Sequence, residues 1–112
     1  MVHISAQATD ALGDDEVLVF DWHRVAICCA SAGELSLRSA PRARMESARA
    51  FRRLDGPAPV FAHRFAYPHL VGRDVAVDCR RTLGIRHFTS NLPADFGLRA
   101  SLGRVPPLKE TS

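Results

Sequence analysis

The stretch VLVFDWHRVAICCASAGELSLR, residues 17–38, decides the fold class of this chain. Its first six residues are dense in Val, Leu and Phe, which is typical of a buried β-strand. A second apolar run, residues 25–30, follows after two residues, so the two runs form either one long bent strand or a tight hairpin. Ser31–Gly33 then predicts a turn, and residues 34–38 alternate polar and apolar side chains, as a half-exposed strand does. From Val25 onward this pattern indicates a β-hairpin.

Short helices are expected on both sides of this hairpin. Ser5 is a suitable N-cap and Gly13 a suitable stop, so the alanine-rich segment between them predicts a short helix. Pro41 interrupts the sheet, and apolar residues then recur at three-residue spacing until Gly56, which predicts an amphipathic helix. The residues at that spacing are Met45, Ala48, Phe51 and Leu54.

Three more strands are predicted in the second half of the chain. Residues 60–65 form the first candidate, and residues 67–72 predict a turn or a single helical turn after it. Residues 75–80 alternate clearly and place Cys79 on the apolar face of a strand. A last strand is expected over residues 85–89.

Proline and glycine punctuate the polar remainder of the chain. This pattern predicts a C-terminal tail over residues 92–112, after a single domain over residues 1–91. A chain of 112 residues has room for one hydrophobic core. The predicted fold class is α+β, with mainly antiparallel sheets and one or two short helices packed against them.

Composition narrows the class of protein further. The chain is 46% hydrophobic and 24% charged, as globular domains are, and a net charge of +3 does not by itself indicate nucleic acid as a partner. No apolar run reaches the roughly 20 residues of a membrane span. Residues 1–10 lack the features of an export signal, so we expect a cytoplasmic protein without a membrane partner. No nucleophile elbow, phosphate-binding glycine loop or His-Glu zinc helix occurs, so we expect no enzymatic activity.

The three cysteines and one histidine are the candidate metal ligands. Cys28 and Cys29 are adjacent, and with Cys79 they make an odd number, which is a poor disulfide framework. Free thiols or a metal centre are therefore the options, because thiolates bind zinc, copper(I) and iron–sulfur centres. His63 lies between two phenylalanines in a predicted strand and needs a polar partner there. The other interpretation is that the cysteines pack as small hydrophobic residues.

A basic segment is the second candidate site. Residues 38–53 contain six arginines against a single acidic residue, Glu46. If this segment is helical, Arg42, Arg49 and Arg53 share a face with Glu46. Glu46 can then pair with Arg42 and with Arg49 or another neighbour at helical spacing. Such a face is either an ordinary solvated surface or a contact for an acidic partner.

The order of several short motifs carries a family resemblance. Cys28-Cys29 stands shortly before Gly33, and a strand from Val60 precedes three further segments, which are Tyr67-Pro68-His69-Leu70-Val71-Gly72, Val75-Ala76-Val77-Asp78 and Phe88-Thr89-Ser90-Asn91. This order is similar to that of the HesB-like, A-type iron–sulfur carrier family, over about residues 2–91. The resemblance implies a HesB-like β fold and a site for an iron–sulfur cluster, iron or zinc. The family's C-terminal Cys-Gly-Cys motif is missing here, so the implied cluster site is incomplete.

Two functions follow from these features. The first is a metal- or iron–sulfur-binding accessory protein with an incomplete cluster site, held by Cys28 or Cys29 together with Cys79 and His63. The second is a non-catalytic protein-interaction module, which forms a homodimer or binds an acidic partner through the Arg-rich segment 38–53. Both hypotheses depend on which side chains the fold brings together.

Overall fold

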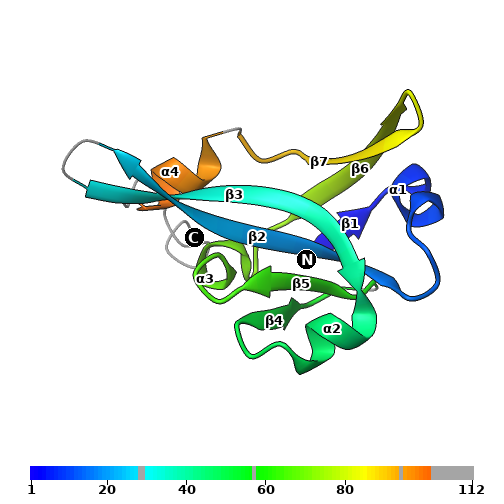
Figure 1. Ribbon diagram of the computed structural model, residues 1–112, viewed down its shortest axis with the longest axis horizontal. Helices are drawn as coiled ribbons and strands as arrows, with labels where there is room; N and C mark the ends of the chain where they lie inside the picture. Colours follow the sequence, from blue (N-terminus) through cyan, green and yellow to red (C-terminus); the bar gives the residue numbers. More distant parts are fainter. Residues whose placement is uncertain (28–29, 57, 94, 102–112) are drawn as a thin grey trace.

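Two β-sheets dominate the computed structural model, and short helices lie around them (Figure 1). The structure describes residues 1–27, 30–56, 58–93 and 95–101. Within these residues there are seven strands and four helices of four to six residues each. The predicted α+β class with mostly sheet is therefore confirmed. None of the helices in the described residues is long and apolar enough to span a membrane.

The predicted hairpin is the largest element. Strand β2 (Glu16–Ile27) pairs antiparallel with strand β3 (Ala30–Pro41) along its whole length. The two predicted apolar runs therefore belong mainly to one long strand. Residues 28–29, which stand between the two strands in the sequence, lie outside the described part of the chain.

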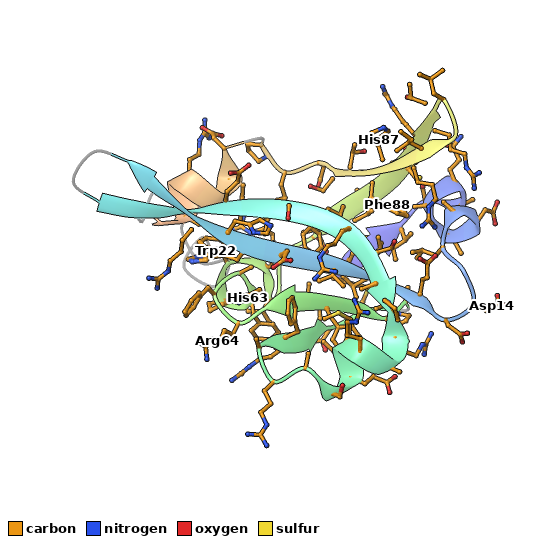
Figure 2. All side chains as sticks on the ribbon, viewed as in Figure 1. Asp14, Trp22, His63, Arg64, His87 and Phe88 are labelled. Carbon is orange, nitrogen blue, oxygen red and sulfur yellow. The ribbon has the colours of Figure 1, made fainter. Side chains whose placement is uncertain are left out.

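The predicted turn at Ser31–Gly33 is wrong, because these residues lie inside β3. Gly33 is opposite Arg24 in the continuous register of the hairpin. The ring of Trp22 lies over this glycine, and a Cβ atom at position 33 would be 1.7 Å from Cζ2 of Trp22 (Trp22 is labelled in Figure 2). Gly33 therefore serves the packing of a tryptophan across the hairpin and does not mark a turn.

Two shorter strands complete the four-stranded sheet, whose order is β3-β2-β5-β4. Strand β5 (Val60–His63) runs parallel to β2, with Val60 opposite Leu18. Strand β4 (Phe51–Leu54) pairs antiparallel with β5 and is the edge of the sheet.

The amphipathic helix predicted over residues 45–54 is only partly right. Helix α2 (Arg42–Ser47) ends early, and the last four residues of the predicted helix form β4 instead. The three-residue spacing arose because Met45, Ala48 and Phe51 all pack against the same small apolar cluster. Leu54 packs in the main core on the other face of the sheet.

The second sheet contains three strands in the order β1-β6-β7. They are β1 (Val2–Ile4), β6 (Val75–Thr82) and β7 (Ile85–Ser90), where β1 is parallel to β6 and β7 is antiparallel to it. Helix α1 (Ala6–Ala11) follows β1, and its N-cap is Ser5, as predicted. Helix α3 (Tyr67–Leu70) is the single helical turn expected before β6.

The tail predicted from residue 92 does not begin there. Helix α4 (Phe96–Ser101) lies against β3, and Phe96 is only 3% exposed within the main core. Gly97 allows this contact, because a Cβ atom there would be 2.7 Å from the carbonyl oxygen of Gly33. The core thus reaches Ala100, and residues 102–112 lie outside the described part of the chain.

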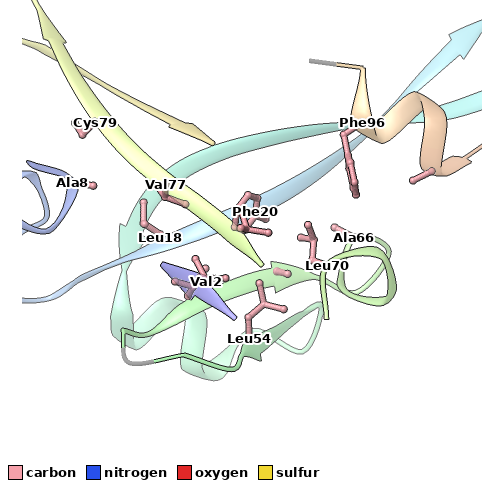
Figure 3. Close-up of a cluster of buried hydrophobic side chains, with 14 of the residues drawn as sticks. Val2, Ala8, Leu18, Phe20, Leu54, Ala66, Leu70, Val77, Cys79 and Phe96 are labelled. Atoms are coloured by element: carbon pink, nitrogen blue, oxygen red, sulfur yellow. The ribbon is translucent and has the colours of Figure 1, made fainter. Parts of the chain in front are cut away.

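The main core lies between the two sheets (Figure 3). Leu18 and Phe20 of β2 face it, together with Val77 of β6. A smaller cluster lies on the opposite face of the four-stranded sheet, where α2 covers Val17 and Val19. Because β2 is buried on both faces in this region, its residues form a continuous apolar run and do not alternate.

Candidate interaction surface

The predicted metal ligands are not brought together in the described residues. Cys79 lies on β6 in the main core and is 5% exposed. His63 ends β5 and contacts Phe51, which packs on the smaller cluster at the other face of the four-stranded sheet. One metal ion cannot bind both side chains, so Cys79 and His63 do not fit a shared metal centre. Cys28 and Cys29 lie outside the described residues, so their role stays a prediction.

Cys79 packs as a small hydrophobic residue. Its thiol has one weak contact, 3.9 Å from Sγ to the carbonyl oxygen of Arg80. A depression of about 640 Å³ between α1 and β6 reaches this residue and is lined also by Asp10 and Arg80. No group of three or more His, Cys, Asp or Glu side chains in the described part of the chain is arranged to hold a metal ion.

His63 has the polar partner that the sequence requires, but it is a backbone group. The N–H of Phe65 donates to Nδ1 of His63 at 3.1 Å. The imidazole also contacts two rings edge-on or tilted, those of Phe51 at 5.3 Å and Phe65 at 5.2 Å between ring centres. Burial lowers the pKa of His63 below its ordinary value, which favours the neutral ring.

Three arginines lie over aromatic rings around the end of β5. The guanidinium carbons of Arg24 and Arg64 are 5.4 Å and 5.0 Å from the ring centre of Phe65. Arg52 lies 5.7 Å from the ring centre of Tyr67. These are cation–π distances, and all three arginines are exposed (Arg64 is labelled in Figure 2).

We call this region the Arg–aromatic surface. It comes from β2, β4, β5, the segment after β5 and the first residue of α3, so it forms only when the four-stranded sheet is complete. Its members lie on both faces of the sheet at this end, because Phe51 packs on the smaller cluster and Tyr67 on the main core. Phe65 is 40% exposed, which leaves apolar ring surface available beside the charges. The members of the surface are Arg24, Phe51, Arg52, His63, Arg64, Phe65 and Tyr67.

Further arginines extend the positive charge along α2, the turn after it and β4. Arg42, Arg44, Arg49 and Arg53 are all exposed. The predicted helical face is only partly right, because Arg42 and Glu46 both lie in α2, whereas Arg49 and Arg53 come after its end at Ser47. Between described residues, the arginine ion pairs involve Arg38, Arg86 and Arg99, and none involves an arginine of the Arg–aromatic surface or of this extension.

Arg38 belongs to the predicted basic segment but is already paired. Its Nε donates to Oδ2 of Asp21 at 3.0 Å. Burial by itself would raise the pKa of Asp21, but the Trp22 N–H and Arg38 outweigh it, so the pKa of this carboxyl is lowered. Asp21 is therefore charged at neutral pH and neutralises Arg38.

Sequence reasoning missed half of this surface. Arg24 and Arg64 were outside the predicted basic segment, and the rings of Phe65 and Tyr67 were assigned no binding role. The only local signal is the run HRFAY at residues 63–67, where two basic residues are followed closely by two aromatic residues. Comparison with known protein families, curated proteins and solved structures found no match for this chain.

Proposed function

We propose that this protein is a non-catalytic interaction module, which binds an acidic segment of a protein partner through its Arg–aromatic surface. The observation that carries the proposal is the set of three exposed guanidinium groups held over rings, without a carboxylate partner among the described residues. Four more exposed arginines lie on α2, on the turn after it and on β4. The partner is acidic, as the sequence predicts, but the site is centred at the end of β5 and not on the segment 38–53.

The arrangement favours carboxylates for a physical reason. A ring below the plane of a guanidinium group restrains the arginine while its N–H groups remain available at the edge. Those N–H groups form a planar fork that matches the two oxygens of a carboxylate. Because the side chains are already restrained, less conformational entropy is lost when a partner binds.

Charge at the sheet edge argues against the homodimer as the alternative at this surface. If two copies paired through β4, Arg52 and Arg53 of one copy would lie close to the same residues of the other. Like charges directly across a strand pair are destabilising. The carboxylates of an acidic partner would instead attract Arg52 and Arg53.

Contacts at Phe65 favour a protein partner over single-stranded nucleic acid. Base binding depends on open aromatic faces on which bases stack. The Phe65 ring already has the guanidinium groups of both Arg24 and Arg64 against it. Bases would have to displace these groups, whereas carboxylates bind to the groups themselves.

Peptide binding tests the proposal. A fluorescein-labelled peptide rich in glutamate is titrated with the protein, and anisotropy gives the Kd. Arg52→Ala combined with Arg64→Ala should raise the Kd by roughly tenfold, because two exposed charge contacts are lost. Higher salt should weaken binding of the unchanged protein.

A matched control uses Arg80→Ala combined with Arg81→Ala. These arginines are also exposed but lie on β6, in the other sheet. The control removes the same net charge, so its Kd should stay close to that of the unchanged protein. An equal loss of affinity in both double variants would contradict a specific surface. Tighter binding of an oligothymidine than of the peptide would contradict the choice of a protein partner.

Metal binding stays a separate prediction that rests on Cys28 and Cys29. Elemental analysis of protein purified without oxygen tests it, with the Cys28→Ala, Cys29→Ala double variant as the control. Metal-free protein would reject it. We also propose a cytoplasmic location, where the odd number of cysteines would stay reduced.

A further inference from the structure

Strand β4 is the edge of the four-stranded sheet, and the hydrogen bonds to β5 show which of its backbone groups point outward. The N–H of Arg64 donates to the carbonyl oxygen of Ala50 at 2.7 Å. In an antiparallel pair the bonded positions alternate, so Arg52 and Leu54 also exchange bonds with β5. The N–H and the carbonyl group of Arg53 therefore point away from β5.

No described strand pairs with the outer side of β4. The N–H of Phe51 donates a hydrogen bond to the carbonyl oxygen of Ala48 at 3.3 Å, which closes the turn before the strand. At the other end, the carbonyl oxygen of Asp55 accepts a bond from Val2 at 3.4 Å. The open edge is therefore short and centred on Arg53.

From this edge we infer that the partner segment binds as an added strand: an extended, acidic stretch of protein chain pairs with β4 through the N–H and carbonyl group of Arg53. The inference rests on the proposed function and states how the acidic segment is held. Main-chain bonds at a sheet edge supply part of the affinity, and side chains across the new strand pair supply the selectivity.

The charges of β4 define the sequence of that segment. Arg52 and Arg53 are neighbours in a strand, so their side chains point to opposite faces of the sheet, and both are exposed. An added strand can pair with both only if it has two adjacent acidic residues, one for each face. Residues with high strand propensity on either side would favour the extended form.

The occupant is therefore a partner with an acidic pair, and not a second copy of this chain through the same edge. Exposed arginines on an edge strand also keep two edges from pairing with each other. Both the protective role and the binding role predict that two copies of the chain repel each other at this edge. Only the binding role also predicts that a suitable acidic peptide forms hydrogen bonds with the backbone of Arg53.

Amide hydrogen exchange of the unchanged protein is the direct test. The probe is the peptide acetyl-Thr-Val-Glu-Glu-Val-Thr-amide, with Gln-Gln in place of Glu-Glu as the control peptide. At saturating probe, exchange of the Arg53 amide should slow by about fivefold or more, because its N–H becomes bonded. The Arg52 amide is an internal control, since it is already bonded to β5 and should change much less.

Two variants separate the contribution of the Arg53 backbone to binding from that of its charge. Arg53→Ala removes the guanidinium group, and Arg53→Pro removes the same group and also the N–H. Proline is tolerated where the N–H of an edge strand points to solvent. The inference therefore expects Arg53→Pro to bind the probe at least about threefold more weakly than Arg53→Ala. Circular dichroism shows whether both variants fold, and if the proline variant does not, hydrogen exchange decides alone.

The outcomes distinguish this inference from the proposed function. If the probe binds in a charge-dependent way while Arg53 exchange is unchanged, the added strand is wrong and the acidic partner stands. If the Glu-Glu and Gln-Gln peptides bind equally, or if Arg52→Ala with Arg64→Ala has no effect, the proposed function fails. Slow exchange at Arg53 with the Glu-Glu probe alone supports both.

Discussion

Gly33 lies inside β3, where a glycine normally weakens a strand, so its presence requires a reason. The reason is the ring of Trp22, which occupies the place where a side chain at position 33 would begin. Trp22 in turn stacks on His69 of α3, with ring centres 5.9 Å apart and planes 17° apart. One missing side chain thus lets the hairpin and α3 share an aromatic contact.

Replacing this glycine should be costly. Gly33→Ala is expected to lower the free energy of unfolding by about 2 kcal/mol, because the Trp22 ring must move to make room for the methyl group. Urea denaturation followed by circular dichroism measures the change, because it also works in a variant that lacks Trp22, the one tryptophan of the chain. In a Trp22→Leu background the same alanine should cost about 1 kcal/mol less. Equal costs in both backgrounds would show that the ring is not the obstacle.

Leu83 shows the opposite situation, a side chain in a conformation that does not suit it. Its φ is +53°, the following Gly84 has φ +79°, and the two form the turn between β6 and β7. Leucine is strained in this left-handed region, whereas asparagine adopts it more easily. The side chain is 97% exposed, so packing does not compensate for the strain.

Relief of this strain should stabilise the protein. Leu83→Asn is expected to raise the free energy of unfolding by about 1 kcal/mol. Chemical denaturation measures it, and Leu83→Ala is the control, because alanine keeps the strain and should change the free energy by less than about 0.5 kcal/mol. A stability of Leu83→Asn equal to or below that of Leu83→Ala would contradict the explanation.

At the scale of elements, periodicity revealed the strands that have one buried face and missed those that depend on a neighbour. The sequence of residues 75–80 alternates apolar and polar side chains and so predicts a strand. In the structure Val75, Val77 and Cys79 face the main core, and the residues between them are exposed. The sequence FRRL of β4 has no such alternation. It becomes a strand only because β5 is present to pair with it, and two prolines separate the two strands in the sequence.

The same limit explains the candidate site. A basic segment was visible in the sequence, but the cation–π pair of Arg52 with Tyr67 joins residues from two elements. The sequence contains no information on that contact without the sheet order. Thiols are chemically distinctive, so the sequence makes all three cysteines candidate ligands, yet Cys79, the one described cysteine, is a packed core residue.

Helix α4 gives a test at this scale, because its sequence contains a glycine and predicted only a tail. Phe96→Ala is expected to lower the free energy of unfolding by about 3 kcal/mol, since a buried ring is removed from the main core. Thermal or urea unfolding measures it. Arg99→Ala on the same helix removes only an exposed ion pair with Asp95 and should change stability by less than about 0.5 kcal/mol. Similar small effects of both changes would mean that α4 does not belong to the core.

At the scale of the whole molecule, one ion pair between described residues connects the two sheets. Arg86 of β7 lies 3.0 Å from Oε1 of Glu16 at the start of β2. Arg86 also donates to the carbonyl oxygen of Ala11 at the end of α1. The N–H of Gly13 donates to the same Glu16 carboxylate at 2.8 Å. Glu16 therefore holds the end of α1 and both sheets in one arrangement.

This carboxylate should make the stability of the fold sensitive to acid. The hydrogen bond from Arg86, followed by that from Gly13, lowers the pKa of Glu16 from 4.5 to about 2. A carboxyl group whose pKa is lowered by folding stabilises the folded state at every pH above its ordinary pKa. This contribution is lost as the pH falls from 4.5 to about 2. Glu16→Gln should lower the free energy of unfolding by about 1 kcal/mol at pH 7 and flatten its decline in that window. Urea denaturation across the pH range measures both effects, and Asp95→Asn, which breaks the exposed pair of Asp95 with Arg99 of α4, is the control. If Glu16→Gln loses stability between pH 4.5 and 2 as steeply as the unchanged protein, the junction of the two sheets does not depend on this charge.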